Sequence, residues 1–155
     1  LHVDTPECAN IEKSSQLALG QALENIIRNA LRHTPEQSKV SLTLTGDNNN
    51  YVITVTDEGT GVPESMLDAI FEPFFRVDKA RAAKNYVHAA KRSGFGLGLA
   101  LAKRQIAAVG GDISAINRAA LIKDNALHRD ASATKQTGLV VTITLPKSFN
   151  AAFAN

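Results

Sequence analysis

The chain has 155 residues, a formal net charge of +2 and 44% hydrophobic residues, which suits a single domain with one core. The small charge and the aromatic content of 5% argue against a nucleic-acid partner. The single cysteine, Cys8, excludes an internal disulfide and is expected to be an ordinary thiol in a reducing cytoplasm. No apolar run is long enough to span a membrane. Because the chain opens at Leu1 without Met, we expect it to be part of a longer protein.

Helical periodicity begins at about Ser15 and ends shortly before Pro35, which predicts the first helix. One stripe of apolar side chains is expected to be buried, namely Leu19, Leu23, Ile27 and Ala30. A second stripe is polar and consists of Asn25, Asn29 and Arg32, spaced by turns of the helix. Asparagine is a mediocre helix former, so the two asparagines are either ordinary solvated side chains or part of a binding site.

Residues 40–45 and 51–56 alternate apolar and polar side chains, which predicts two half-buried strands joined by a hairpin turn at 46–50. Residues 1–3 are consistent with a short edge strand. The second strand of the hairpin leads directly into Asp57-Glu-Gly-Thr-Gly61. An acid at a strand end, followed by two glycines, is typical either of a simple turn or of backbone that faces a ligand.

A short helix is predicted over 62–71, and it leads into the apolar cluster Phe71-Glu-Pro-Phe-Phe-Arg76. The basic stretch 77–93 has no strong periodicity and is predicted to be a mobile lid, poorly ordered without nucleotide. Next comes Ser93-Gly-Phe-Gly-Leu-Gly-Leu99, which runs into an amphipathic helix over 100–109. Glycines at a helix N-terminus suit a phosphate, although a flexible loop entering a helix has the same pattern.

The end of the chain predicts two more strands, 112–116 and 139–145, antiparallel to each other and joined by a long polar loop at 119–137. The preceding helix is expected to bury one stripe, Leu99, Ala102, Ile106 and Val109. Together the elements indicate an α+β fold. We expect a two-layer sandwich, with one mixed and mostly antiparallel sheet covered by about three helices.

The spacing of the three glycines excludes the commoner phosphate-binding motifs. Gly94, Gly96 and Gly98 are spaced GxGxG and follow a basic loop, whereas a dinucleotide fold places GxGxxG directly after a strand. The GxxxxGK[ST] motif of a P-loop is absent, and so are the HRD and DFG elements of eukaryotic-type protein kinases.

Four segments in a fixed order resemble the N, G1, F and G2 boxes of sensor histidine kinases, namely Asn25-Ile-Ile-Arg-Asn29-Ala, Asp57-Glu-Gly-Thr-Gly61, Phe71-Glu-Pro-Phe-Phe-Arg76 and Gly94-Phe-Gly-Leu-Gly-Leu99. These boxes belong to the ATP-binding catalytic domain of the family shared with DNA gyrase, Hsp90 and MutL. The resemblance covers residues 16–146 and implies a Bergerat-type ATP-binding fold, in which 77–93 is the ATP lid. The segments 77–93 and 119–137 are longer than is usual in the family.

The resemblance implies a role for each matching residue. Asn29 matches the asparagine whose side-chain oxygen coordinates Mg²⁺, and Asn25 would help to hold phosphate or metal-bound water. Arg32 matches a basic position that meets phosphate, and His33 stands where an aromatic side chain often lies near the ribose or adenine. Asp57 matches the carboxylate that accepts a hydrogen bond from the adenine amino group.

The glycine-rich boxes and the lid supply the remaining candidates. Gly59 and Gly61 would let the base lie against the backbone, and Arg76 could stabilise charge on the γ-phosphoryl group during transfer. The G2 box would contact the phosphates and hinge the lid, through Gly94, Gly96, Leu97, Gly98 and Leu99. Lys79 and Arg92 in the lid are possible phosphate ligands, and the sequence does not choose between them.

One position separates a kinase from an ATPase. Gyrase-type enzymes carry a glutamate general base where this chain has Asn25, and the neighbouring Glu24 points about 100° away around the helix. The resemblance therefore implies a histidine kinase that binds Mg-ATP and transfers the γ-phosphoryl group to a histidine on a separate dimerisation domain. No histidine of this chain lies in an acceptor motif; they are His2, His33, His88 and His128.

The acceptor and dimerisation domain is thus expected to lie elsewhere in the parent, and the fragment is expected to be monomeric and inactive in autophosphorylation. The parent would be a homodimeric bacterial sensor anchored in the inner membrane, with this domain in the cytoplasm and a response regulator as its partner. Two alternatives are an ATP-binding sensing module without efficient transfer and a gyrase- or MutL-like ATPase.

Overall fold

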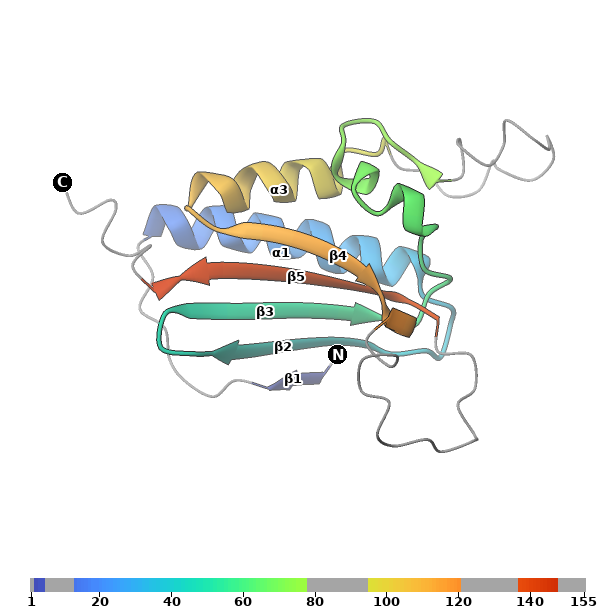
Figure 1. The fold of residues 1–155 in the computed structure, drawn as a ribbon, viewed down its shortest axis with the longest axis horizontal. Helices are drawn as coiled ribbons and strands as arrows, with labels where there is room; N and C mark the ends of the chain where they lie inside the picture. The colour runs from blue at the N-terminus through green and yellow to red at the C-terminus, as the bar shows by residue number, and fades with distance from the viewer. Residues whose placement is uncertain (1, 5–12, 78–94, 121–136, 148–155) are drawn as a thin grey trace.

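The computed structural model describes residues 2–4, 13–77, 95–120 and 137–147 (Figure 1). Five strands form one sheet in the order β1-β2-β3-β5-β4. Their bounds are His2–Asp4 for β1, Val40–Gly46 for β2, Asn50–Asp57 for β3, Asp112–Asn117 for β4 and Leu139–Pro146 for β5. β1 pairs with β2 in parallel, and the other neighbours are antiparallel. The predicted mixed, mostly antiparallel sheet with a short edge strand is confirmed.

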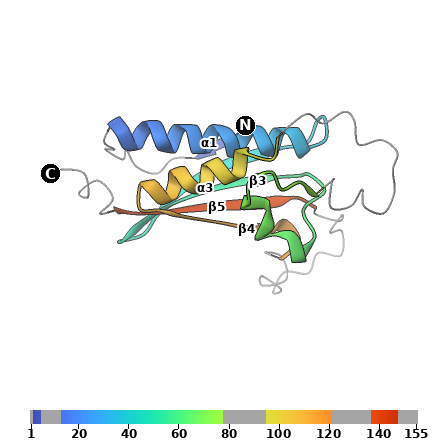
Figure 2. The ribbon, with the colours of Figure 1, turned by 90° about the horizontal axis from the view of Figure 1, so that it is seen from above.

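Two α-helices, α1 (Lys13–His33) and α3 (Gly98–Ala108), lie side by side on one face of the sheet (Figure 2). The short helix predicted over 62–71 is wrong in detail, because two 3₁₀ turns, η1 (Glu64–Met66) and η2 (Ala69–Phe71), take its place. Their hydrogen bonds join each residue to the third before it, as from Met66 N–H to the Pro63 carbonyl, which winds the chain more tightly than an α-helix. In the described part of the chain, no helix is long and apolar enough to cross a membrane.

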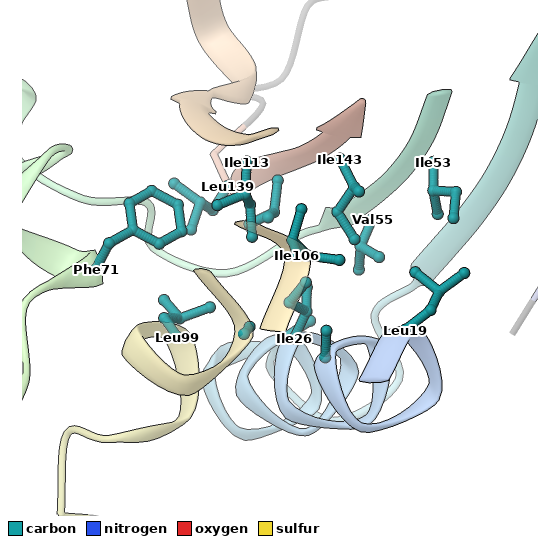
Figure 3. Close-up of a cluster of buried hydrophobic side chains, with 14 of the residues drawn as sticks. Leu19, Ile26, Ile53, Val55, Phe71, Leu99, Ile106, Ile113, Leu139 and Ile143 are labelled. Carbon is teal, nitrogen blue, oxygen red and sulfur yellow. The ribbon is translucent and has the colours of Figure 1, made fainter. Parts of the chain in front are cut away.

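The core lies between the two helices and the sheet (Figure 3). Ile26 of α1, Ile106 of α3 and Ile143 of β5 are at most 1% exposed and form its centre. The predicted stripe of α3 is buried throughout, at Leu99, Ala102, Ile106 and Val109. Removing an isoleucine or leucine side chain from such a position costs about 2–5 kcal/mol of stability, so these residues fix α1 and α3 on the sheet.

The buried stripe of α1 differs from the predicted one. Leu19 and Ala30 are buried as expected, but between them the core receives Ala22 and Ile26, whereas Leu23 and Ile27 are half-buried beside it. The pair Ala22 and Ile26 and the pair Leu23 and Ile27 form two apolar rows of α1, so periodicity alone did not show which row faces the sheet. The rotation matters for the site, because Ala22 and Ile26 precede Asn25 and Asn29 by three residues, which brings the polar stripe closer to the core than the predicted row would.

The face of the sheet turned away from the helices carries more hydroxyl than apolar side chains. The hydroxyl residues include Ser41, Thr43, Thr54, Thr56, Ser114, Thr142 and Thr144, and the apolar ones are Val52, Ile116 and Val140. The hydroxyl residues stand opposite one another across the strands, as Thr54 does with Thr43 on β2 and with Thr142 on β5. Threonine is β-branched and favours strands, and cross-strand threonine pairs add to sheet stability. This face is therefore strand-forming without being strongly apolar.

The ends of two strands and two helices meet at one end of the sandwich, at the right of Figure 1. There β3 ends, β5 starts, α1 ends and α3 starts. The β2–β3 hairpin turn lies at the opposite end, where Asp47 Oδ1 accepts hydrogen bonds from the N–H groups of Asn49 and Asn50, both 2.7 Å long. The predicted binding segments are thus gathered at one end, and the hairpin turn is remote from them.

Candidate functional site

A cavity of about 370 Å³ opens where the ends of α1 and β3 meet the starts of α3 and β5. The predicted site residues that line it are Asn25, Asn29, Arg32, His33, Asp57, Gly61, Arg76, Gly96, Leu97, Gly98 and Leu99. Gly59 lies beside the cavity and is not part of its lining. Segments separated by more than 70 residues in the sequence therefore contribute to one site.

Asp57 ends β3 and is the buried carboxylate of the cavity, with 4% of the residue exposed. Its Oδ1 accepts two backbone hydrogen bonds, from Gly59 N–H at 2.8 Å and from Leu139 N–H at 3.1 Å. Leu139 starts β5, which pairs with β3, so the sheet itself brings the second donor to the carboxylate. Two donors on one oxygen fix the orientation of the side chain and leave its second oxygen available for a ligand.

Gly138 is a residue that the sequence reasoning missed. It has a φ of +138°, and a Cβ added there would lie 2.0 Å from the carbonyl oxygen of Asp57. Its own carbonyl accepts a hydrogen bond of 2.9 Å from Arg118 N–H. Only glycine fits between these groups, so the start of β5 can approach Asp57 closely enough for the Leu139 hydrogen bond.

Asn117, at the end of β4, is a second residue that the sequence did not indicate. Its Oδ1 accepts from Val62 N–H at 2.9 Å, and its Nδ2 donates to the Val62 carbonyl at 2.6 Å. The amide therefore pairs with both backbone groups of Val62, as a neighbouring strand would. Because Gly61 and Val62 line the cavity, Asn117 holds that wall in place.

A second clamp joins the same loop to the sheet through Glu58. Its carboxylate accepts from the backbone N–H of Lys39 at 3.0 Å and forms an ion pair with Arg118 at 3.1 Å. The hydrogen bond from Lys39, and then the one from Arg118, hold the pKa of Glu58 below its ordinary value. Glu58 is not among the residues that line the cavity. Its charge therefore stabilises the loop through the contacts with Lys39 and Arg118.

The polar stripe of α1 faces the cavity, as predicted. Asn25, Asn29, Arg32 and His33 all line it, and Arg28 lies on the same side of the helix. Their spacing of three and four residues puts them on one face of a helix with 3.6 residues per turn. Asn25 and Asn29 therefore belong to a cavity wall, and their role in binding a ligand stays a prediction.

The F box and the G2 box are joined at the other wall. Phe74 donates its N–H to the Gly96 carbonyl at 2.8 Å, and a Cβ at Gly96, whose φ is +72°, would lie 2.6 Å from the Phe75 carbonyl oxygen. Phe71 anchors this segment in the core, where it is 6% exposed, and Arg76 follows as a half-buried lining residue. The contact between the boxes therefore places Arg76 next to the start of α3.

The charges of the lining favour an anion. Three arginines, Arg28, Arg32 and Arg76, border the cavity, and Asp57 is the carboxylate that lines it. Among the described residues, no cluster of three or more histidine, cysteine, aspartate or glutamate side chains could hold a metal ion by itself. A metal here would need oxygen ligands from the ligand as well as from an amide such as Asn29.

Several predictions fall outside the described residues. They concern Gly94, Lys79, Arg92 and Cys8, the lid over 77–93 apart from Val77, and most of the long loop over 119–137. His88 and His128 also lie outside. The expectation that the lid is poorly ordered without nucleotide therefore stays a prediction.

Comparison with known proteins identifies the family of this fold and cavity. Residues 14–148 match the family of histidine kinase-, DNA gyrase B-, and HSP90-like ATPases. The chain belongs to this family. The match contains all four boxes and confirms the family that their resemblance implied.

Individual relatives are sensor kinases. The sensor histidine kinase WalK of Bacillus subtilis is 43% identical over 95 residues, which are 60% of this chain and 14% of WalK, so the chain spans a small part of that relative's length. The mycobacterial sensor histidine kinase MprB matches 84% of this chain and 70% of its own, with 27% identity and a TM-score of 0.62. Full-length ShkA in complex with AMPPNP matches 83% of this chain and 21% of its own, with 26% identity and a TM-score of 0.57.

Proposed function

We propose that this chain is the ATP-binding catalytic domain of a sensor histidine kinase and that it transfers the γ-phosphoryl group of ATP to a histidine on a separate dimerisation domain. The observation that carries the proposal is the cavity itself, in which Asp57, the stripe of α1 and the start of α3 face one another. The relatives support it, because WalK and MprB are sensor histidine kinases and ShkA binds AMPPNP, an analogue of ATP.

The adenine base would bind at Asp57. The fixed Oδ1 keeps the carboxylate in place, and the second oxygen would accept a hydrogen bond from the amino group of adenine. Guanine carries an oxo group at that position and cannot donate, so the site selects adenine. Gly59, Gly61 and His33 surround this end of the cavity and would contact the base or the ribose.

The phosphates would lie along α1 toward the start of α3. Arg32, Arg76 and the residues Gly96, Leu97, Gly98 and Leu99 line the cavity and would contact the phosphates. Mg²⁺ prefers oxygen ligands and commonly binds through few protein groups together with substrate phosphates, which fits the Asn29 amide. When bound, the ion would neutralise charge on the phosphates, and Asn25 would hold phosphate or metal-bound water.

The site suits transfer better than hydrolysis. Asn25 lines the cavity, and by resemblance to gyrase-type enzymes it takes the position of their glutamate general base. An amide cannot accept a proton at neutral pH. In the transfer, the bond between the γ-phosphorus and the oxygen of ADP breaks, a bond from phosphorus to the acceptor imidazole nitrogen forms, and the imidazole loses a proton. Arg76 would stabilise the charge on the phosphoryl group as it moves.

The rest of the parent protein is proposed from the relatives. We expect a homodimer that carries the acceptor histidine, a membrane anchor and a response regulator as the recipient of the phosphoryl group. On this proposal the present domain is the cytoplasmic part that binds Mg-ATP. By itself it would be a monomer without autophosphorylation, because the acceptor belongs to another domain.

The test is to incubate the chain with a cognate dimerisation domain and ATP labelled in its γ-phosphate. Acid-labile, base-stable label on the acceptor domain is the expected result, and it should disappear with an Arg76→Ala variant. ATP binding without any phosphohistidine would favour a sensing module instead. Rapid release of phosphate by the chain alone would favour an ATPase, and either result would overturn the kinase assignment.

A further inference from the structure

The cavity has a direction along α1. A Cβ added at Gly59, next to Asp57, would lie 2.6 Å from the carbonyl oxygen of His33, so the carboxylate end adjoins the last turn of α1. A Cβ added at Gly98 would lie 3.8 Å from Oδ1 of Asn25, so the start of α3 adjoins an earlier turn. Eight residues of helix between His33 and Asn25 correspond to about 12 Å. The cavity therefore runs along α1 from the Asp57 end to the Gly98 end.

Arg28 lies on this path, nearer to Asn25 than Arg32 is. It lines the cavity, although it belongs to none of the roles that the four boxes imply. Its guanidinium forms an ion pair with Glu24, one turn earlier on α1, and the two side chains are 64% and 63% exposed. The guanidinium thus borders the cavity and is open to a ligand that enters from solvent.

The partner of Arg28 is exchangeable. An exposed ion pair between residues four apart on a helix is weak, because water screens it and two long side chains must be ordered. A terminal phosphate carries more charge than a carboxylate, and its oxygens match the planar fork of a guanidinium. Exchanging Glu24 for such a phosphate would keep the hydrogen bonding of Arg28 and strengthen it.

We infer that Arg28 binds the γ-phosphate of ATP and that Glu24 competes with the nucleotide for it. The inference rests on the proposed function, which places the base at Asp57 and the phosphates toward Gly98. Arg28 then distinguishes ATP from ADP. Once the γ-phosphoryl group has been transferred, Arg28 returns to Glu24, and ADP has lost one contact that held ATP.

The experiment is isothermal titration calorimetry of the 155-residue chain with Mg-ATP and with Mg-ADP. Arg28→Ala should weaken ATP binding about fivefold, the scale of one exposed charged contact, and should change ADP binding less than about twofold. Alanine is the best helix former, so this variant keeps α1. Arg104→Ala, which removes an exposed arginine of α3 outside the cavity, is the matched control and should change neither affinity.

Glu24 supplies the second arm. Glu24→Gln should strengthen ATP binding about twofold, and it should have no effect when Arg28→Ala is also present. Equal losses for ATP and ADP in Arg28→Ala, or the same gain from Glu24→Gln with and without Arg28, would overturn the inference. An unmodified chain that binds no ATP would overturn the proposed function with it, whereas normal ATP binding by Arg28→Ala would overturn the Arg28 assignment alone.

Discussion

Asp57→Asn is the sharpest perturbation of the proposed base site, because it alters the hydrogen bonding of one atom and hardly changes the shape. The two backbone N–H groups both bond to Oδ1, so an asparagine amide oxygen in that place keeps both partners. The NH₂ group of the amide then takes the position of the second carboxylate oxygen. Adenine would present its own amino group there, so two donors would face each other.

The size of the effect follows from these bonds. Losing a hydrogen bond to a charged group costs about 1.5–3 kcal/mol, which weakens ATP binding by about tenfold to a hundredfold. The fold is affected less, since the bonds from Gly59 and Leu139 become neutral instead of disappearing. We expect a stability loss of about 1–2 kcal/mol for the pair. The substitution should therefore weaken ATP binding more than it destabilises the fold.

Calorimetry with ATP and with inosine triphosphate tests this reasoning, with thermal unfolding as the check on the fold. Inosine carries an oxo group in place of the amino group of adenine, and this oxo group can accept a hydrogen bond from the amide NH₂ that the substitution introduces. Relative to the unmodified chain, Asp57→Asn should therefore have a lower affinity for ATP and a higher affinity for inosine triphosphate. Unchanged ATP affinity, or equal loss of both nucleotides, would show that Asp57 does not read the base.

Three further substitutions probe separate parts of the site. Asn29→Ala should abolish the Mg²⁺ dependence of ATP binding, measured by titrations with and without the metal, and a surviving dependence would place the ligand elsewhere. Gly138→Ala adds a Cβ that would lie 2.0 Å from the Asp57 carbonyl oxygen, so urea unfolding should show a loss of about 2–4 kcal/mol; a midpoint equal to that of the unmodified chain would refute the close approach. Glu58 has a lowered pKa through the hydrogen bonds from the Lys39 N–H and from Arg118, so it stabilises the fold above its ordinary pKa and loses that contribution as the pH falls through the lowered one. Glu58→Gln should flatten this acid limb of stability against pH, and an identical limb in both proteins would contradict the assignment.

Local patterns were sufficient for most of the fold. Alternation predicted the hairpin of β2 and β3, and helical periodicity predicted α1, α3 and the polar stripe that lines the cavity. The exact buried row of α1 was not predictable, because its 22/26 and 23/27 rows are both apolar and the sheet decides between them. The two 3₁₀ turns were missed for a related reason, since a segment of about ten residues has too little periodicity to define its helix type.

The supporting residues of the site could not be found in the same way. Asn117 clamps Val62 across 55 positions, and Leu139 donates to Asp57 across 82. Neither residue is unusual for its place in the sequence, and only strand pairing brings it to its partner. Gly138 gave a weak signal as a glycine just before a strand, which is also where many ordinary turns have one.

The hydroxyl side chains on the face of the sheet turned away from the helices affect how readily copies of the protein associate. A sheet with helices on a single side risks stacking against the sheet of another copy, and apolar side chains on that side would reward the contact. The rows of Thr54 and Thr142 and their neighbours keep the strand preference of β-branched residues while offering groups that water satisfies well. The hydroxyl residues that build these strands therefore also reduce the apolar area that this face offers to another copy.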